Sequence, residues 1–503
     1  MERVGPLMPD RPLVLRGGRV LDAAHFIGAA DVLVQHGHIV AVGPPGLSAP
    51  DGAETVDASC RLLHPGLVNA HTHGHGNLAR SMGDRWTLEL LLAASPWITA
   101  LEGVEQKALS VTIGAAEMVL KGCTAVYDLF VELPGPTRDG IAAVAEAYQA
   151  VGMRAVIAPM VADLTLYQAV PALQAALPAL LREQAGGLRL PRWQDTMNEL
   201  RAILTDWRFD RDWLRPALAP TIPLHCGDPF LEACRDLAEE FGTGLHSHVA
   251  EAKFQVVTAA QRYGRSMVAH LDGLGLLGPR FTAAHGVWLD AEDMARLGGR
   301  GASVAHNPAS NMRLGNGVAD MAGMLKAGVN VGLGTDAATC SDNLNMYTAM
   351  HFAGAASHAR GPDPAAWATT AQVVEAATAG SAQVLGFPKI GRIAAGFAAD
   401  IVFLDLNAPT LIPLNDPVNQ LVFGEDGTSV HSVMIGGRFV VRDRKLLTVD
   451  LPRLAARAAD VRTMLNERGA AKRSSFECIA PALADFCPAL ARTPWPINRW
   501  CGC

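Results

Sequence analysis

The sequence predicts an α/β fold: a parallel (β/α)8 barrel of the TIM type, joined to a small β-sandwich domain that both ends of the chain form together. Two observations predict it. In the middle of the chain, eight short apolar runs alternate with helical stretches rich in alanine and leucine, the pattern of consecutive βα units. At both ends, short runs rich in β-branched residues are separated by Gly and Asp, a pattern typical of β structure.

The small domain is expected to combine residues 1–65 with residues 395–450. The first segment contains the runs PLVLRGGRVLD, DVLVQHGHIVAVG and ETVDASCRLLH, and the second contains ADIVFLDL and SVHSVMIGGRFVVRD. The dipeptide Gly436-Gly437 interrupts the last of these runs and predicts a hairpin. Both segments consist of short runs rich in β-branched residues separated by turns, so we expect their strands to pair in one domain.

Residues 66–394 are the predicted barrel. Its eight strands are expected in the runs GLVNAHTH, CTAVYDLF, RAVIAPMVAD, LRPALAPTI, GLHSHVAE, RFTAAHGVW, ASVAHNP and NVGLGTDA. They are apolar on both faces, as buried parallel strands should be. The long segment at about 164–213 is interpreted as a helical insertion that serves as a lid or a subunit contact. Residues 451–503 are expected to hold one helix, LPRLAARAADVRTMLNERGA, and a tail with Pro and Cys.

The composition argues against several classes of protein. Half of the 503 residues are hydrophobic, and the net charge of −7 comes without a basic block, so nucleic acid is not expected as a partner. No stretch has the length and apolarity of a signal peptide or a membrane span. Nine scattered cysteines without a Cys-x-x-Cys pair suit reduced thiols, and Cys501-Gly502-Cys503 is interpreted as a packed or disordered tail rather than a soft-metal site. We therefore expect a cytoplasmic enzyme that acts on a small molecule and forms a homo-oligomer through the insertion and the tail.

Polar residues stand where the first predicted strand ends. His71 and His73 are two positions apart, so their side chains point to the same side of a strand. Active sites of such barrels lie at the carboxyl ends of the strands, where two imidazoles can bind one metal ion. Taken alone, such a pair is more often two surface or hydrogen-bonded histidines than a metal site. His75 shares the spacing but is expected to lie in the following loop.

Three further strand ends carry similar residues. The fifth has the pair His246 and His248, followed by Glu251, the sixth ends at His285, and the eighth ends at Asp336. The joint pattern predicts a catalytic metal site. The fourth strand contains no lysine to bridge two metals, so we expect one divalent ion per subunit. Three neutral imidazoles and a carboxylate suit Zn²⁺, while Fe²⁺, Co²⁺ and Mn²⁺ remain alternatives.

Six segments together resemble the amidohydrolase superfamily. They are HPGLVNAHTH, HSHVAE, AHGVWLD, HNPASNMRLGNG, GLGTDA and GRIAAGFAADIVFLD, which follow one another within about residues 12–445. The chain is most similar to the branch of chlorotriazine hydrolases and of cytosine, guanine and adenosine-type deaminases. The resemblance implies that the metal ligands are His71, His73, His248 and Asp336.

The resemblance also implies the catalytic residues. Glu251 matches the proton shuttle, His285 the histidine that orients the attacked group or the water, and Asp336 the base. A metal ion lowers the pKa of bound water toward about 7. Protonation of a poor nitrogen leaving group by Glu251 can then contribute about 10²–10⁴-fold. A carboxylate at a helix start that only accepts backbone N–H groups is the alternative for Glu251.

Other residues near the barrel mouth are candidates for binding the substrate. Asn307 and Asn311 lie in HNPASNMRLGNG, and Asp342 and Asn343 follow Asp336 in CSDN. Asn and Asp are also common loop formers, so support of the mouth is the alternative role for all four.

These features predict a metal-dependent amidohydrolase that hydrolyses a non-peptide C–N bond of a small, mostly neutral molecule: an amide, aryl urea, carbamate or N-substituted heterocycle. The alternative is a hydrolytic deaminase of an amino-heterocycle of the triazine, pyrimidine or purine type, and hydrolytic dehalogenation is a smaller possibility. The first is slightly favoured because Thr221-Ile222 replaces the His-Ala/Ser-Pro-Tyr sequence of many nucleoside-type deaminases. A scaffold barrel without catalysis would lack metal ligands, and a nucleic-acid deaminase would need a Pro-Cys-x-x-Cys motif.

Overall fold

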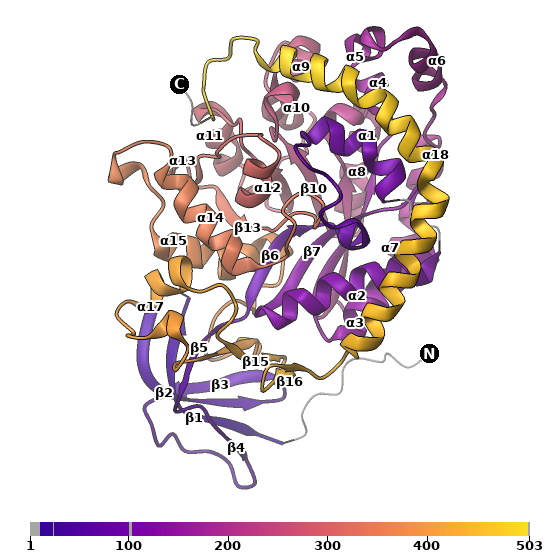
Figure 1. Cartoon of the computed structure of the whole chain (residues 1–503). Coiled ribbons are helices and arrows are strands. Elements are labelled where there is room, and N and C mark those ends of the chain that lie inside the picture. Colours follow the sequence, from indigo (N-terminus) through magenta and orange to yellow (C-terminus); the bar gives the residue numbers. More distant parts are fainter. Residues whose placement is uncertain (1–10, 24, 100–102, 501–503) are drawn as a thin grey trace.

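The structure is a computed structural model that describes residues 11–23, 25–99 and 103–500, and it contains the predicted barrel (Figure 1). The terminal Cys-Gly-Cys lies outside the described residues. Eight parallel strands pair in the order in which they occur in the sequence. They are β6 (Leu67–Thr72), β7 (Cys123–Val131), β8 (Arg154–Val161), β9 (Leu214–Pro220), β10 (Gly244–Val249), β11 (Phe281–His285), β12 (Ser303–His306) and β13 (Asn330–Leu333). The last strand meets the first again, since the Asp336 N–H donates to the His71 carbonyl at 2.9 Å.

An outer ring of helices covers the barrel, and local signals set the ends of these helices. For example, α3 begins after Thr137, whose hydroxyl accepts the Gly140 N–H, and ends at Gly152 with φ of +85°. The ring comprises α2 (Val104–Leu120), α3 (Arg138–Val151), α7 (Trp193–Thr205), α8 (Asp228–Glu240), α9 (Lys253–Tyr263), α10 (Met267–Gly273), α11 (Ala291–Gly299), α13 (Met321–Lys326), α14 (Met346–His358), α15 (Thr370–Glu375) and α16 (Ser381–Leu385).

The segment between β8 and β9 is helical, as expected, but its four helices differ in role. The helix α7 buries Thr196, Leu200, Ile203 and Leu204 and packs against α3 and α8, so it is part of the outer ring. The added elements are α4 (Leu166–Ala169), α5 (Pro171–Ala176) and α6 (Ala179–Gly187), which lie beside the far end of the last helix (Figure 1).

The small domain is one nine-stranded sheet built from both ends of the chain. Strand β14 is antiparallel to β5, with Ile401 opposite Pro65, so the predicted pairing of the two segments is confirmed. The predicted hairpin at Gly436-Gly437 is also present, because it joins β15 to β16. The strands are β1 (Leu13–Asp22), β2 (His25–Gln35), β3 (His38–Gly43), β4 (Glu54–Asp57), β5 (Arg61–Pro65), β14 (Ile401–Asp405), β15 (Val430–Ile435), β16 (Arg438–Arg442) and β17 (Lys445–Leu446).

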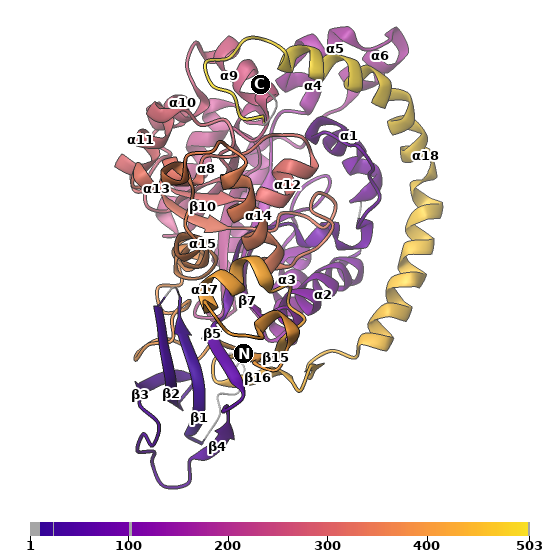
Figure 2. The same cartoon turned by 60° about the vertical axis from the view of Figure 1, so that its left-hand side comes forward.

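The C-terminal helix is much longer than the sequence predicted. The helix α18 (Leu451–Ala491) has 41 residues and continues through Pro481 and Pro488, which were expected to lie in a tail. It runs along the outside of the barrel from the small domain toward α5 and α9 (Figures 1 and 2). Its buried residues repeat at spacings of four and seven and so form one apolar stripe: Leu465, Gly469, Phe476, Leu483 and Cys487. None of the described helices has both the length and the hydropathy of a membrane span.

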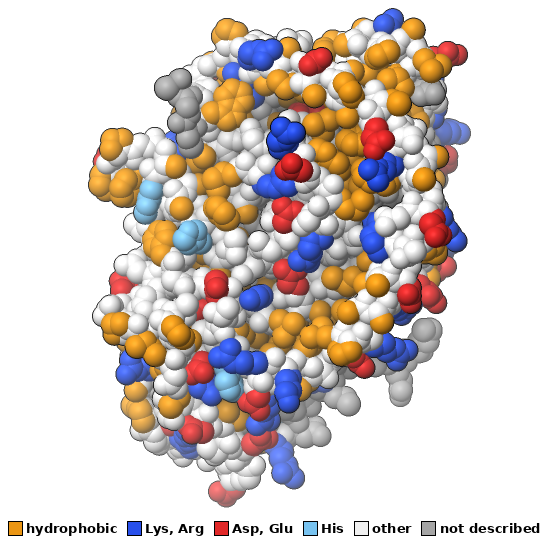
Figure 3. Space-filling view, in the orientation of Figure 1, with side chains coloured by type: hydrophobic (Ala, Val, Ile, Leu, Met, Phe, Trp, Pro, Cys, Tyr) orange, Lys and Arg blue, Asp and Glu red, His pale blue; other side chains and the backbone are white. Residues whose placement is uncertain are grey.

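This stripe packs against α1 (Leu88–Ile98), and hydrophobic side chains gather where the two helices meet (Figure 3). The Phe476 ring lies 5.3 Å from the Trp86 ring and 5.9 Å from the Trp97 ring, between centroids. A Cβ at Gly469 would lie 2.9 Å from Trp97 Cδ1, so glycine permits the close approach. The helix α1 is therefore held from outside by α18.

Replacing Leu483 by alanine should loosen this contact. The side chain is 1% exposed, and truncation of a buried leucine costs about 2–5 kcal/mol. We expect amide hydrogen exchange in α1 and in the second half of α18 to become about tenfold faster or more. The control is Asp485→Ala, an exposed position on the same turn. Unchanged exchange in α1 after Leu483→Ala would contradict the holding role of α18.

Candidate active site at the barrel mouth

The carboxyl ends of the strands surround a cavity of about 70 Å³. Its polar lining contains the following predicted metal-binding and catalytic residues: His73, His248, Glu251, His285 and Asp336. Its apolar lining comes mainly from α1, which covers the mouth with Leu88, Leu91, Leu92 and Ile98. The site is therefore enclosed between the barrel and α1.

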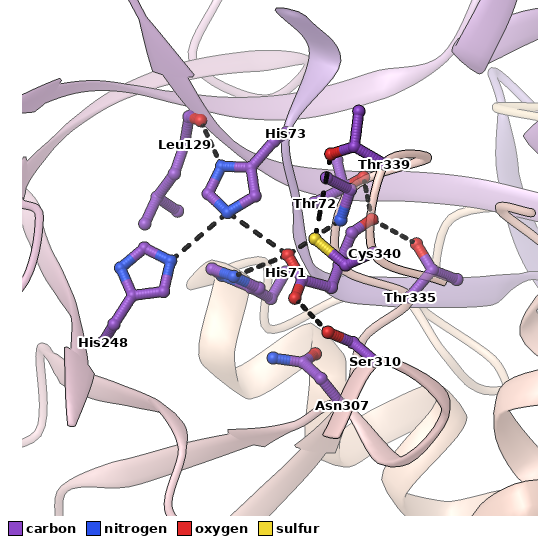
Figure 4. Close-up of polar contacts among 12 residues, drawn as sticks. His71, Thr72, His73, Leu129, His248, Asn307, Ser310, Thr335, Thr339 and Cys340 are labelled. Carbon is purple, nitrogen blue, oxygen red and sulfur yellow. Dashed lines mark hydrogen bonds and ion pairs between the residues drawn. The ribbon is translucent and has the colours of Figure 1, made fainter. Parts of the chain in front are cut away.

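Two imidazoles face each other across the cavity. The Nε2 atoms of His73 and His248 are 3.2 Å apart. The Nδ1 of His73 donates to the Leu129 carbonyl at 2.7 Å (Figure 4). The Nδ1 of His248 donates to the Thr221 carbonyl at 2.7 Å. These carbonyls fix the tautomer that leaves both Nε2 lone pairs directed at a common point, an arrangement typical of metal-ligating histidines.

Asp336 lies next to the same point. Its Oδ1 is 3.3 Å from His73 Nε2 and 3.6 Å from His71 Nε2. The Ser310 hydroxyl donates to Oδ2 at 2.6 Å, and the Ala337 N–H donates to Oδ1 at 2.7 Å. Burial alone would raise the pKa of Asp336, but the His71 and His73 side chains beside it hold that pKa well below the usual range. The carboxylate is therefore charged at neutral pH.

His71 completes this group from within β6. Burial lowers the pKa of His71 to about 3, so its ring is neutral, and among the described residues neither ring nitrogen has a hydrogen-bond partner. Ligand atoms of His71, His73 and Asp336 all lie within 4.8 Å of one another, and so do those of His71, His248 and His285. His71 and His248, whose pKa values burial lowers, lie with His73 beside a charged carboxylate, and this donor set fits one divalent ion such as Zn²⁺. Despite burial, the nearby Asp336 raises the pKa of His73, so a bound ion would take the place of a proton there.

Glu251 and His285 lie beside the cluster. Glu251 Oε2 is 3.7 Å from His285 Nε2, and Asn316 Nδ2 donates to Glu251 Oε1 at 3.0 Å. Burial, followed by the charges of Asp336 and Glu89, raises the pKa of Glu251 well above its usual range. The Glu251 carboxyl can therefore carry a proton at neutral pH, which a group that exchanges protons with a substrate requires.

Backbone strain occurs at two residues of this site. His285 has φ of +72° and Asp336 has φ of +60°, both in the left-handed region that non-glycine residues rarely adopt. Such strain costs about 1–3 kcal/mol per residue and is concentrated at functional sites. His285 ends β11 and Asp336 lies just past the end of β13, and this backbone conformation directs both side chains into the cavity.

The four expected substrate contacts do not line the cavity. Asn311 Oδ1 accepts from His285 Nδ1 at 2.9 Å, and Asn307 Nδ2 lies 3.3 Å from the same nitrogen, so both lie behind that ring. Asp342 accepts from Arg313 Nε at 3.0 Å, and Asn343 Oδ1 accepts the N–H of Asn345. The structure thus places Asn307 and Asn311 where they orient His285, and Asp342 and Asn343 where they stabilise the neighbouring loop.

At two histidines and at α1, the structure adds to what the sequence indicated. His75 was expected in a loop, but it lies in the short helix η1 (Gly74–Ala79) and lines the cavity. His246 points into the barrel below the site, with its ring centroid 5.0 Å from that of His71, so it does not line the cavity. The sequence analysis also did not identify the leucines of α1 as cavity residues. The signal was present, because a helix that has apolar residues on more than one face is expected to be covered on both sides.

The comparisons with known proteins agree with this architecture. The chain matches the amidohydrolase family over residues 62–440. It is 33% identical over 460 residues to the 5-methylthioadenosine/S-adenosylhomocysteine deaminase of Syntrophobacter fumaroxidans. The aligned region covers 88% of this chain and 96% of that protein. It is 31% identical over 390 residues to the 5'-deoxyadenosine deaminase of Methanopyrus kandleri, covering 77% of this chain and 83% of that protein.

Solved structures give the same result. An adenosine deaminase from Xanthomonas campestris with bound zinc superposes with a TM-score of 0.79 at 28% identity, covering 90% of this chain and 98% of that one. Atrazine chlorohydrolase from Arthrobacter aurescens TC1, complexed with zinc, superposes with a TM-score of 0.80 at 25% identity, covering 90% and 100%. The chain therefore belongs to the amidohydrolase family, as a metal-dependent hydrolase of carbon–nitrogen bonds other than peptide bonds.

Proposed function

We propose that this enzyme is a hydrolytic deaminase of an amino-heterocycle, with adenine nucleosides that carry a modified 5' position as the first substrates to examine. The observation that carries the proposal is the buried carboxyl of Glu251, whose pKa burial raises, beside His285 and the charged Asp336. Release of ammonia from a ring carbon needs such a proton donor, because a nitrogen anion is a poor leaving group. The deaminase names of the relatives place this reaction ahead of the carbonyl-directed hydrolysis that the sequence slightly favoured.

We propose that His71, His73, His248 and Asp336 hold one divalent ion, and that the ion is Zn²⁺. Support comes from the two facing Nε2 atoms, the backbone carbonyls that fix their tautomers, and the zinc found in the structural relatives. When bound, such an ion lowers the pKa of a water molecule toward about 7 and so supplies hydroxide at neutral pH.

The protein groups around this ion would transfer the protons. Asp336 would accept the proton that the attacking water loses, since its carboxylate is ionised beside the metal ligands and its Oδ2 is held by Ser310. Glu251 would donate its proton to the ring nitrogen beside the attacked carbon, and Asp336 would pass the proton it took from water to the amino group, which leaves as ammonia. The hydroxyl added to the ring would then return a proton to Glu251. His285, oriented by Asn311, holds the oxygen that adds to the ring.

Substrate binding requires α1 to move. The cavity of about 70 Å³ is far smaller than the roughly 300–1,000 Å³ of sites that hold drug-sized ligands. Its apolar cover of Leu88, Leu91 and Leu92 excludes water once closed, which strengthens the electrostatic interactions inside. We therefore propose that α1 is the lid of the site.

A second candidate reaction, hydrolytic removal of chloride from a triazine, is favoured by the likeness to atrazine chlorohydrolase and by the apolar cover of the cavity. The same hydroxide attacks a ring carbon in both reactions, so the leaving group distinguishes them. A chloride does not need the proton of Glu251, whereas an amine does.

Product analysis tests these proposals. The zinc-loaded protein would be incubated with 5'-deoxyadenosine, 5'-methylthioadenosine, adenosine, a chlorotriazine and an aryl urea, and the products identified by mass spectrometry. We expect ammonia and a ring-hydroxylated product from at least one adenine nucleoside. Release of chloride alone would support the second candidate, and release of an aniline alone would overturn both.

A further inference from the structure

A second cavity lies at the opposite end of the barrel, where the strands begin. It measures about 450 Å³, within the range of sites that bind small molecules. Its walls come from the amino ends of β9 and β10, from the loop before β11 and from the end of α16. It does not share a residue with the catalytic cavity.

The charges around this cavity are all of one sign. The guanidinium groups of Arg211, Arg215 and Arg280 line it, and none of the described lining residues is acidic. Within the described part of the chain, no hydrogen bond or ion pair is made by the side chain of Arg211 or Arg280. The acidic group nearest to Arg215 is Asp212, 4.0 Å away, and its side chain is 88% exposed to water. Three cations thus share the cavity without a countercharge inside it.

The protein positions one of these cations. Arg215 Nε donates to the Arg211 carbonyl at 2.7 Å, another of its nitrogens donates to the Gly386 carbonyl, and its guanidinium lies 4.4 Å from the centre of the Phe387 ring. Burial lowers the pKa of Arg215, and the charges of Arg211 and Arg154 lower it further against the opposing effect of Asp212. A bound anion would relieve this repulsion.

The inner end of the cavity offers an unused hydrogen-bonding group. Tyr127 is 2% exposed and lines the cavity, and its hydroxyl has no hydrogen-bond partner among the described residues. A buried hydroxyl without a partner costs about 1–3 kcal/mol. Gly244 leaves room beside it, since a Cβ there would lie 2.9 Å from the Tyr127 oxygen. Val156 and Val384 also line the cavity and add apolar surface to it.

We propose that this cavity binds a small organic phosphate monoester. Arg211, Arg215 and Arg280 would hold the phosphate, because guanidinium groups form paired, charge-assisted hydrogen bonds with its oxygens. The organic part would lie against Val156 and Val384 and reach the Tyr127 hydroxyl. The site is independent of the proposed deamination, because none of these residues contacts the catalytic cavity.

Calorimetric titration at constant ionic strength tests the proposal, with phenyl phosphate, inorganic phosphate and phenol as the probes. We expect the metal-loaded enzyme to bind phenyl phosphate saturably, and at least tenfold more tightly than either inorganic phosphate or phenol. The double variant Arg211→Ala/Arg280→Ala should weaken phenyl phosphate binding at least tenfold, and Tyr127→Phe should weaken it severalfold. Arg208→Ala, an exposed arginine paired with Glu146, is the matched control and should bind as the wild type does.

The outcomes separate clearly. Equal binding of phenyl phosphate by the wild type and the double variant would overturn the proposal, because the ligand would then be elsewhere. Equal affinity for inorganic phosphate and phenyl phosphate would overturn the recognition of an organic part. Circular dichroism and the hydrolytic activity of the double variant should match those of the wild type, since both arginines are exposed and distant from the active site.

Discussion

Replacement of His248 by alanine should remove the bound metal and lower turnover by about 10³-fold or more, since hydroxide is scarce at neutral pH without a metal ion to lower the pKa of water from 15.7. The reason is the position of the ring: its Nε2 lies 3.2 Å from His73 Nε2, while the Thr221 carbonyl fixes its other nitrogen. Metal content per subunit, measured by plasma mass spectrometry on dialysed protein, is the primary readout, and activity is the second.

The chain offers a matched control two residues earlier. His246 is on the same strand and faces the same side, but it lies deeper in the barrel, against the Tyr127 ring at 4.6 Å between centroids. His246→Gln should keep close to one metal ion per subunit. If His248→Ala retained the metal while His246→Gln lost it, the metal ligand on β10 would be His246 and not His248.

Glu251→Gln should leave the metal in place and lower turnover by about 10²–10⁴-fold, the usual contribution of a positioned proton donor. The substitution is conservative in shape, because a glutamine oxygen can still accept the hydrogen bond from Asn316 Nδ2. Only the proton is lost. The measurement is kcat at saturating substrate, together with metal content.

A second buried carboxyl serves as the control for Glu251. Glu89 is 5% exposed and does not line the catalytic cavity. Its charge contributes to the raised pKa of Glu251. Glu89→Gln should change kcat by less than about tenfold, because the side chain only perturbs the shuttle through space. A fully active Glu251→Gln enzyme would remove Glu251 from the mechanism.

The barrel could be predicted from the sequence because its signals are local. Each strand is a short apolar run between turns, and alternation along the strand puts His71 and His73 on one side. The structure brings these residues together with His248, Glu251, His285 and Asp336. Their roles as ligands and proton carriers remain predictions that the variants above test.

What the sequence did not reveal depends on depth and on distant partners. His246 and His248 share a face, so their spacing alone does not say which of the two reaches the cavity; the family resemblance pointed to His248, and the closed barrel places His248 there. Asn311 was expected to contact the substrate from the loop after the seventh strand, but its side chain instead accepts a hydrogen bond from His285. The length of α18 was missed because Pro481 and Pro488 usually interrupt a helix, whereas here packing against α1 stabilises it.

The pairing of β5 with β14 has a consequence for how the protein is made. The two strands stand at opposite ends of the barrel sequence, so β1, β2, β3 and β5 leave the ribosome long before β14 exists. Until then β5 presents an unpaired edge, which is a template for aggregation. The barrel must form first and bring its two ends together, because closing so long a loop unaided is slow. Nascent chains that stall within the barrel would therefore be the ones that need a chaperone.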